Sequence, residues 1–421
     1  MSAAATSGCC AAATVPRRSG LIALAAVVGP GVLAGLSDDD PAGIATYSIL
    51  GADYSYRLLW VLLISVAALI LFHELGARMG VVTGQGLAGL VRERYGVRLA
   101  ALAVGVLLVA NIGTTCAEFA GVAASLDLAG ITRYVSVPVA AIAVSTLVLR
   151  GGFHRIEHVL LALGAVFAAY IVSGLLAGPD WGAAAGGLVV PSLPLNRDAV
   201  LAATATVGTT LAPWGLAFIQ SYAVDKRLMP KDLRYERIDV VTGAVMTGVI
   251  GVFVVMACAA TLHADGRSIG DAADAAVALE PLAGHLAALL FGAGLLGAAL
   301  LAASILPLST AYSVGEALGF ETALDDRVRE APVFYGTYGV IVVGAAAVVL
   351  IPGVPLVPIL YLTQALNAIL LLPLLLFIYG ISRDRDLMGP YANGRGAASA
   401  CALAIGLLAV CLGALAVFSL A

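Results

Sequence analysis

Residues 29–45 read Gly-Pro-Gly-Val-Leu-Ala-Gly-Leu-Ser-Asp-Asp-Asp-Pro-Ala-Gly-Ile-Ala, which places three carboxylates and a proline inside an otherwise apolar segment. Pro41 removes a helical hydrogen bond and clashes with the preceding turn, while the neighbouring glycines let the chain unwind. Carbonyl and amide groups next to Asp40 are therefore left without helical partners. The stretch predicts a helix that is broken at Asp40 and Pro41.

The composition identifies the surroundings of this stretch as lipid. Of 421 residues, 61% are hydrophobic and 11% are charged, and the mean hydropathy is +1.02. Apolar runs of about 20 residues, enough to cross a bilayer, recur from Leu21 to the C-terminus. The N–H and C=O groups of a backbone in lipid must form hydrogen bonds within the protein, which only helices and closed β-barrels achieve. The runs lack the alternation of apolar and polar residues that barrel strands show. The sequence therefore predicts an all-α, polytopic membrane protein.

The charged residues predict how the chain crosses the membrane. We expect eleven crossings, at about residues 20–52, 56–78, 99–126, 134–150, 156–177, 199–224, 238–262, 284–305, 333–351, 356–380 and 397–420. With a cytoplasmic N-terminus, the inner connections hold all but four of the 22 basic residues, as the positive-inside rule requires. We therefore expect a multi-pass protein of the cell membrane with a disordered cytoplasmic tail over residues 1–19 and its C-terminus outside.

A second string, Thr209-Thr-Leu-Ala-Pro-Trp-Gly-Leu-Ala217, repeats the Pro-x-Gly-aliphatic-Ala pattern in the sixth expected span. One such break is often only a kink. Five spans separate the two strings, and because five is odd, the second copy crosses the membrane in the opposite direction. Inverted repeats with discontinuous first helices are a transporter architecture in which the broken stretches meet near the bilayer midplane. We therefore expect one transporter domain over residues 20–421, with repeats at about 20–180 and 198–380 and an extra span at 397–420.

Asp40 indicates the class of substrate. A carboxylate in the bilayer core is costly, so it is paired, protonated, or faces a water-filled path that holds a cation. No Lys or Arg lies within either string, so a cation is the simplest partner. Three consecutive helical residues point in different directions. We therefore place Asp40 at the ion and expect Asp38 and Asp39 to line a vestibule.

Three further polar residues stand inside apolar spans. Glu118, in the third span, is either part of a hydrogen-bonded structure or part of the ion path. Gln364 and Asn367 share one face of the tenth span, where they either add amide oxygens to the ion site or form interhelical hydrogen bonds. The sequence leaves both choices open.

Two enzymatic interpretations fail on their spacing. His73-Glu74 begins like the zinc-protease motif HExxH, but Ala77 stands where the second histidine would be. We interpret this pair as a helix-end packing or gating pair. An intramembrane aspartic protease would need a second catalytic Asp in another span, and none stands there in mid-span. The sequence therefore predicts no enzyme and no cofactor.

Together these residues resemble the Nramp family of divalent metal transporters, which have a LeuT-like inverted-repeat fold and work by alternating access. The resemblance extends over nearly all eleven spans and is strongest at residues 29–31, Asp40-Pro41, Ala117-Glu118, 154–157 and Pro213. It implies a metal site formed by both broken helices. The residues expected at the metal are Asp40, Gly43, Thr209, Ala212, Trp214, Gln364 and Asn367, with Asp38, Asp39 and Glu118 as candidates for the ion path.

The departures from the family pattern suggest the ion. Gly43, Ala212 and Trp214 stand where the family has Asn, Met and His. A thioether favours transition metals, and Mg²⁺ keeps several waters beside one or two carboxylates. The chain therefore looks like the divergent Nramp-related magnesium transporters, and we expect Mg²⁺, and also Mn²⁺, as a partly hydrated substrate.

The same departures remove titrating groups. Trp214 and Thr115 stand at the positions of the family's sixth-helix His and third-span Asp, and neither titrates near neutral pH. We therefore expect transport without coupled protons.

Three alternatives remain. A proton-coupled Mn²⁺ or Fe²⁺ symporter shares the family pattern. An amino-acid or amine symporter shares the fold, but Asp40 would repel a substrate carboxylate. A non-transporting membrane sensor is a different class again. In each case the expected partners are the substrate and the lipid bilayer, with no nucleic acid and no obligate protein partner.

Overall fold

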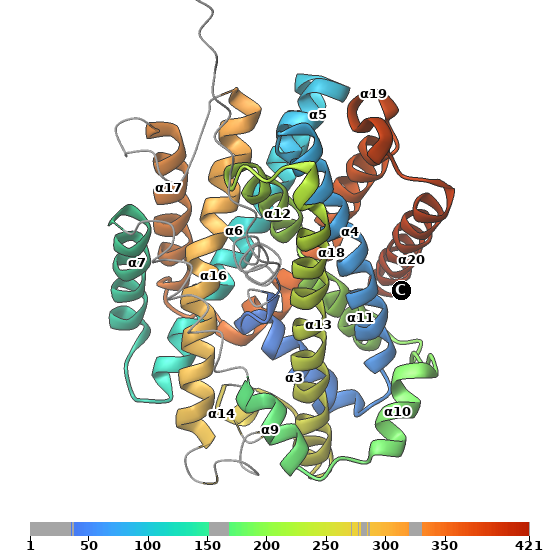
Figure 1. Cartoon of the computed structure of the whole chain (residues 1–421). Coiled ribbons are helices and arrows are strands. Elements are labelled where there is room, and N and C mark those ends of the chain that lie inside the picture. Colours follow the sequence, from blue (N-terminus) through green and yellow to red (C-terminus); the bar gives the residue numbers. More distant parts are fainter. Residues whose placement is uncertain are drawn as a thin grey trace, which may run out of the picture.

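The computed structural model describes residues 35, 38–150, 168–270, 272–276, 278, 284, 287–319 and 331–420. The tail predicted at 1–19, the string at 29–31 and the motif at 154–157 lie outside the described residues. Within them the chain is helical, with no strand (Figure 1). The all-α, polytopic prediction is confirmed.

Eight long helical segments have the length and composition to cross a membrane. They are Leu59–Thr83 (α4), Val97–Asp127 (α6), Arg197–Asp225 (α11 and α12), Pro230–His263 (η2, α13 and η3), Ala287–Leu318 (α16), Pro332–Val349 (α17), Leu356–Ser382 (α18) and Arg395–Ser419 (in α20). Shorter helices occupy the other predicted crossings, namely Pro41–Tyr54 (α3), Arg133–Arg150 (α7) and Ala168–Leu176 (α9). Each predicted span therefore contains a helix. The structure describes only part of the first and of the fifth predicted span.

Short helices at the ends of the spans were not predicted. They are Leu87–Tyr95 (α5), Trp181–Val189 (α10), Ala272–Ala276 (α14) and Arg385–Met388 (α19). Asp180 caps the first turn of α10, accepting a hydrogen bond from the Ala183 amide at 2.9 Å. Such helices are too short to cross a bilayer, and a search for apolar runs of spanning length passes over them.

One predicted boundary is wrong. The eighth span was expected to end at residue 305, but α16 continues to Leu318 through a polar stretch. Its hydroxyl groups bond within the helix: Ser304 donates to the Leu300 carbonyl at 2.7 Å and Ser313 to the Ser309 carbonyl at 3.0 Å. Polar residues that satisfy themselves in this way end the apolar run without ending the helix.

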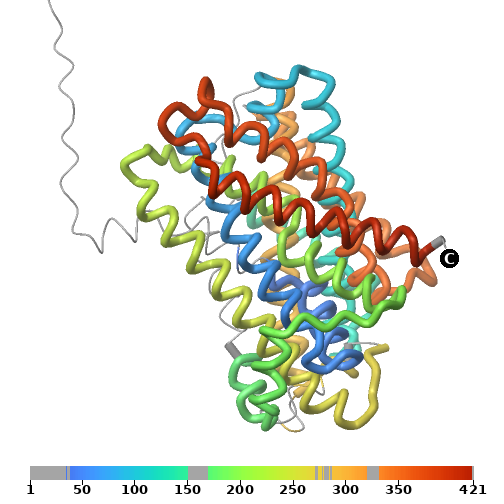
Figure 2. Tube along the Cα trace, turned by 90° about the vertical axis from the view of Figure 1, so that its right-hand side faces the viewer, coloured from blue at the N-terminus to red at the C-terminus, as the bar shows by residue number. Residues whose placement is uncertain are grey.

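The broken span lies at the centre of the bundle and the last helix at its edge. In the most apolar part of the α11–α12 segment, 89% of the residues are buried, compared with 17% in α20. Figure 2 shows α20 running along the outside of the bundle, and in Figure 1 α7 and α17 stand at its opposite side. The central position is the one from which both halves of the broken span contact their neighbours.

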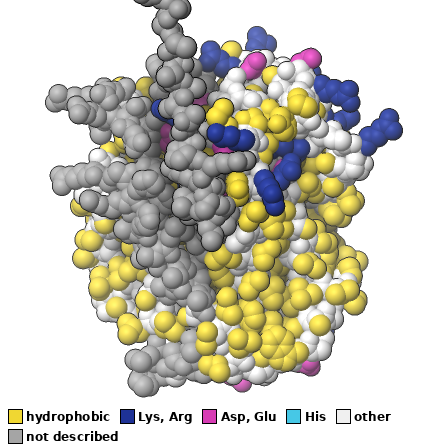
Figure 3. All heavy atoms as spheres, viewed as in Figure 1, with side chains coloured by type: hydrophobic (Ala, Val, Ile, Leu, Met, Phe, Trp, Pro, Cys, Tyr) yellow, Lys and Arg dark blue, Asp and Glu magenta, His cyan; other side chains and the backbone are white. Residues whose placement is uncertain are grey.

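Basic side chains gather at one end of the molecule, around α5, α19 and the connection from α12 to α13 (Figure 3). The sequence predicts such a cluster for one side of the membrane. That this end faces the cytoplasm stays a prediction.

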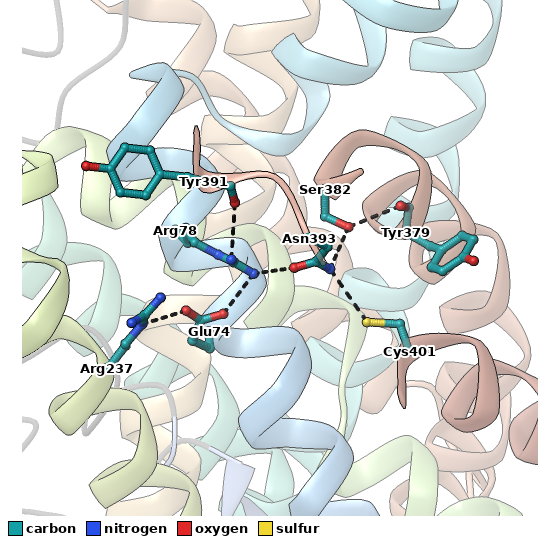
Figure 4. A network of polar contacts seen from close by, with 8 residues as sticks. All are labelled: Glu74, Arg78, Arg237, Tyr379, Ser382, Tyr391, Asn393 and Cys401. Carbon is teal, nitrogen blue, oxygen red and sulfur yellow. Dashed lines mark hydrogen bonds and ion pairs between the residues drawn. The ribbon is translucent and has the colours of Figure 1, made fainter. Parts of the chain in front are cut away.

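A polar network ties helices together at this basic end (Figure 4). Glu74 of α4 forms ion pairs with Arg78 at 3.1 Å and with Arg237 of α13 at 2.8 Å. Arg78 also donates to the Asn393 side chain at 2.6 Å and to the Tyr391 carbonyl at 3.2 Å, just before α20. Glu74 is therefore held in ion pairs, and the packing or gating interpretation suits it better than a zinc-protease motif.

Candidate functional site

The first break places Asp40 at the start of α3. Its backbone is extended (φ −68°, ψ 171°), as the residue before a proline prefers, and Pro41 is the first helical residue. The Asp40 Oδ1 atom accepts from the Gly43 amide at 2.5 Å, and its carbonyl accepts from the Ile44 amide at 2.9 Å. Asp40 thus caps the helix and holds a carboxylate, 3% exposed, inside the bundle.

The second break repeats this backbone. The helix α11 ends at Thr210, Ala212 is extended (φ −72°, ψ 142°), and Pro213 begins α12. Proline has no N–H, so the Thr209 carbonyl loses its helical donor. No side chain caps the first turn of α12. The interruption predicted from the two proline strings is confirmed.

The two breaks lie against each other. A Cβ on Gly43 would stand 3.2 Å from the Thr209 hydroxyl oxygen and 3.3 Å from Asp40 Oδ1. The hydroxyl groups of Tyr47, one turn after Gly43, and of Thr210, the residue after Thr209, are hydrogen-bonded at 3.0 Å. The Thr209 hydroxyl is buried and has no partner. The Asp38 carbonyl oxygen would lie only 2.7 Å from the same Cβ, so Gly43 lets the oxygens of both breaks approach where a side chain would not fit.

The helix α6 brings a second carboxyl group to the first break. Gly121 of α6 lies directly against Pro41, and Glu118, one turn earlier, lies beside Asp40. Glu118 is fully buried, and neither of its carboxyl oxygens has a hydrogen-bond partner of good geometry. Of the two choices left open for Glu118, a satisfied structural hydrogen bond is not observed.

The helix α18 reaches the site through its amide side chains. Gly208 packs on the α18 backbone, so closely that a Cβ at position 208 would lie 2.7 Å from the Ala368 nitrogen. Asn367 donates to Thr114 of α6 and to the Gln364 side-chain oxygen, both at 3.0 Å. The Gln364 amide nitrogen is buried without a partner. Asn367 thus forms the interhelical hydrogen bond that was one of its two alternatives.

Ala212 and Trp214 fill the second break without offering a side-chain ligand. Both are buried, and the Trp214 ring packs on Phe218 with centroids 6.1 Å apart. Ser309 of α16 donates to the Trp214 carbonyl at 3.0 Å. The carbonyl that follows the break is therefore already engaged by a hydrogen bond.

Asp38 and Asp39 do not line an open vestibule in this structure. They are 1% and 0% exposed, and none of their four carboxylate oxygens has a hydrogen-bond partner. Asp38 Oδ1 and His73 Nε2 both lie near Gly215 of α12, at 3.8 Å and 3.1 Å from the position that a Cβ there would take. Sequence reasoning missed this placement of His73, because its neighbour Gly215 is remote in the chain and no local motif joins them.

The site contains buried oxygen atoms and negative charge without a matching cation. Among the described residues, no ion pair joins Asp38, Asp39, Asp40 or Glu118 to a Lys or Arg. Within the same part of the chain, no group of three or more His, Cys, Asp or Glu side chains could hold a metal ion.

A narrow cavity borders the first break. It is lined by Pro41 and Ala45 of α3 together with residues of α14, α16 and α18, among them Ala275, Phe291 and Leu360. The helix α14 lies at the end opposite the basic cluster (Figure 1). The cavity thus lies on the side of the break that faces away from the basic end.

Comparisons with known proteins agree with this geometry. The family model described as "Natural resistance-associated macrophage protein-like" (Nramp) matches residues 31–419. A divalent metal cation transporter MntH of Burkholderia ambifaria is 34% identical over 303 residues, which cover 69% of this chain and 68% of the relative. The MntH of Pectobacterium carotovorum is 30% identical over 381 residues, 88% of each chain.

Solved structures show the same fold. The manganese transporter of Eremococcus coleocola, in complex with an aromatic bis-isothiourea compound, superposes with a TM-score of 0.75 at 19% identity, covering 94% of this chain and 87% of that one. MhsT in complex with L-phenylalanine superposes with a TM-score of 0.62 at 15% identity, covering 96% and 98%. The predicted LeuT-like fold is therefore confirmed, and the chain belongs to the Nramp family of divalent metal cation transporters.

Proposed function

We propose that this chain carries its divalent cation through a site between the two helix breaks, with Asp40 as the charged ligand. The observation that supports this most directly is the extended, buried Asp40, which lies beside Glu118 and, with the Thr209 hydroxyl of the second break, around Gly43. A doubly positive ion compensates this charge where lipid would not. The Thr209 hydroxyl and carbonyl, the Gln364 side chain and retained waters complete the coordination.

The ion is proposed to be of the manganese class. Similarity to proteins named as manganese and divalent metal cation transporters supports the transition-metal alternative over the magnesium branch. Mg²⁺ is the second candidate, and the observation that favours it is Ala212, which brings no soft thioether to the second break.

Proton-coupled symport is proposed as the mode of transport. Glu118 and Asp40 place two carboxyl groups side by side, and such a pair accepts a proton or a metal cation to relieve its repulsion. Uncoupled transport is the second candidate, favoured by Trp214 and Thr115 at the positions of the family's titrating residues. Thr115 only donates to the Asn111 carbonyl of its own helix, at 2.6 Å.

Flux into liposomes that contain the purified protein tests all three statements. Mn²⁺, Mg²⁺ and Ca²⁺ are compared with and without a pH gradient, with pH dyes inside and outside. We expect Mn²⁺ uptake accompanied by acidification of the lumen. Asp40→Ala should abolish uptake of every ion, and if this variant carries Mn²⁺ at the parent rate, the site is misplaced. Metal entry without proton movement would select the uncoupled candidate.

A further inference from the structure

His73 of α4 is a buried side chain with an unused nitrogen atom. It is 2% exposed, and its Nε2 atom has no hydrogen-bond partner. Buried polar atoms are nearly always paired, and an unpaired one costs free energy. The function described above does not use this nitrogen, so its position needs another explanation.

The His73 nitrogen and the Asp38 carboxylate lie near the same glycine, Gly215. A Cβ on Gly215 would stand 3.1 Å from His73 Nε2 and 3.8 Å from Asp38 Oδ1. Gly215 lies in the first turn of α12, directly after the second break. The imidazole from α4 and the carboxylate of the first break therefore both lie within 4 Å of the position that a Cβ at residue 215 would take.

No bond joins the His73 imidazole to the Asp38 carboxylate. Among the described residues, neither an ion pair nor a hydrogen bond links His73 to Asp38, and both Asp38 oxygens lack partners. A nitrogen lone pair and a carboxylate that are both buried and both unpaired form two donors of a first-row divalent ion. Waters can fill the remaining positions, as they do for weakly held ions.

We propose that His73 and Asp38 form a second binding station for the transported ion, beside the Asp40 site and across the first turn of α12. This inference rests on the proposed function and deepens it. Imidazole suits first-row transition metals, whereas Mg²⁺ and Ca²⁺ prefer oxygen ligands. His73 is therefore the residue that gives Mn²⁺ its advantage over Mg²⁺ in a chain whose second break offers only Ala212.

Pulsed electron paramagnetic resonance of bound Mn²⁺ tests the inference, because a coordinated imidazole nitrogen produces a measurable ¹⁴N coupling. The parent protein is compared with His73→Gln, which keeps a polar side chain but removes the imidazole. His263→Gln is the matched control, because His263 lies in η3, which follows α13, and its Nδ1 atom contacts the Ala52 carbonyl at 2.7 Å. We expect the coupling in the parent and in the control, and its loss in His73→Gln.

Transport supplies the second readout. His73→Gln should lower the preference for Mn²⁺ over Mg²⁺ by at least about tenfold, since even partners outside a coordination shell contribute that much to metal affinity. Gly215→Ala keeps the imidazole but places a methyl group 3.1 Å from His73 Nε2 and 3.8 Å from Asp38 Oδ1. This variant should therefore weaken the ¹⁴N coupling. Gly344→Ala, with no atom within 4 Å of its new Cβ, should not.

The outcomes separate this inference from the function on which it rests. Bound Mn²⁺ without ¹⁴N coupling in the parent, a coupling that survives His73→Gln, or unchanged ion preference in that variant would overturn the second station and leave the Asp40 site standing. A parent protein that carries no divalent ion in liposomes would overturn both.

Discussion

Gly121 in α6 lies so close to the ring of Pro41 that a Cβ at position 121 would overlap the Pro41 Cβ and Cγ atoms. This contact fixes the distance between α6 and the first break. It also sets Glu118, one turn away, beside Asp40. The position of the second carboxyl group therefore depends on the absence of a side chain at Gly121.

Gly121→Ala is accordingly expected to abolish most metal uptake. The methyl group must push α6 or Pro41 aside, and overpacking of this kind costs about 1–3 kcal/mol of stability. Metal flux in liposomes and thermal unfolding in detergent measure the two effects. Gly113→Ala is the control on the same helix, because its Cβ would meet side chains only at 3.8 Å. Parent-like flux in Gly121→Ala would show that the spacing at the break is not critical.

Asp40→Asn separates the charge of this residue from its role as a cap. Asn caps helices as well as Asp does, so we expect a change in unfolding free energy within about 0.5 kcal/mol. Metal uptake should nevertheless be lost, because the amide brings no charge to the ion. Asp180→Asn changes an equivalent cap at the surface, on α10, and should leave uptake unchanged. Normal uptake by Asp40→Asn would argue against a charged ligand at this position.

The network at the basic end should depend unequally on its two arginines. The Arg78 side chain is 13% exposed and contacts Glu74, Tyr391 and Asn393, whereas that of Arg237 is 54% exposed and contacts Glu74. Arg78→Ala is expected to lower the unfolding free energy by about 2 kcal/mol, the scale for losing hydrogen bonds made by a charged group, because Glu74 keeps its ion pair with Arg237. Arg237→Ala should cost less than about 1 kcal/mol. Equal effects on thermal unfolding would contradict the assignment of Arg78 as the centre of the network.

Thr114→Val tests whether Asn367 acts as a structural residue. This substitution removes the hydroxyl that accepts the 3.0 Å hydrogen bond from Asn367 but leaves the Asn367 amide in place. We expect a loss of about 1 kcal/mol in stability, typical of interhelical hydrogen bonds in membranes, with little change in the apparent affinity for metal. Asn367→Ala should behave in the same way. A large loss of affinity in Asn367→Ala alone would assign its oxygen to the metal.

The helix breaks could be predicted from the sequence because proline acts locally. Pro41 and Pro213 each force the preceding residue into an extended conformation, whatever packs around it. The pairing of the two breaks followed from the number of spans between them. For the same reason Asp40 could be placed at the first break before any neighbour was known.

Contacts that depend on packing could not be predicted in this way. His73 and Asp38 both come near Gly215 only because α4 and the first turn of α12 converge there, and the motif at His73 in the sequence is only the start of a zinc-protease pattern that lacks its second histidine. The close approach of Gly121 to Pro41 and the extension of α16 to Leu318 likewise depend on partners that are distant in the chain or internal to the helix. Apolar runs and charge asymmetry carry no information about such contacts.

The contrast in burial between the α11–α12 segment and α20 has a consequence for how the sequence can change. Most side chains of α20 touch hydrocarbon, which accepts Leu, Val, Ala or Phe with little distinction. The side chains of α11 and α12 are packed against other side chains on nearly every face. Adding or removing one methyl group there therefore disturbs the packing. A saturation library scored for growth on limiting metal should therefore tolerate almost any apolar exchange along the outermost helix and almost none beside Thr209.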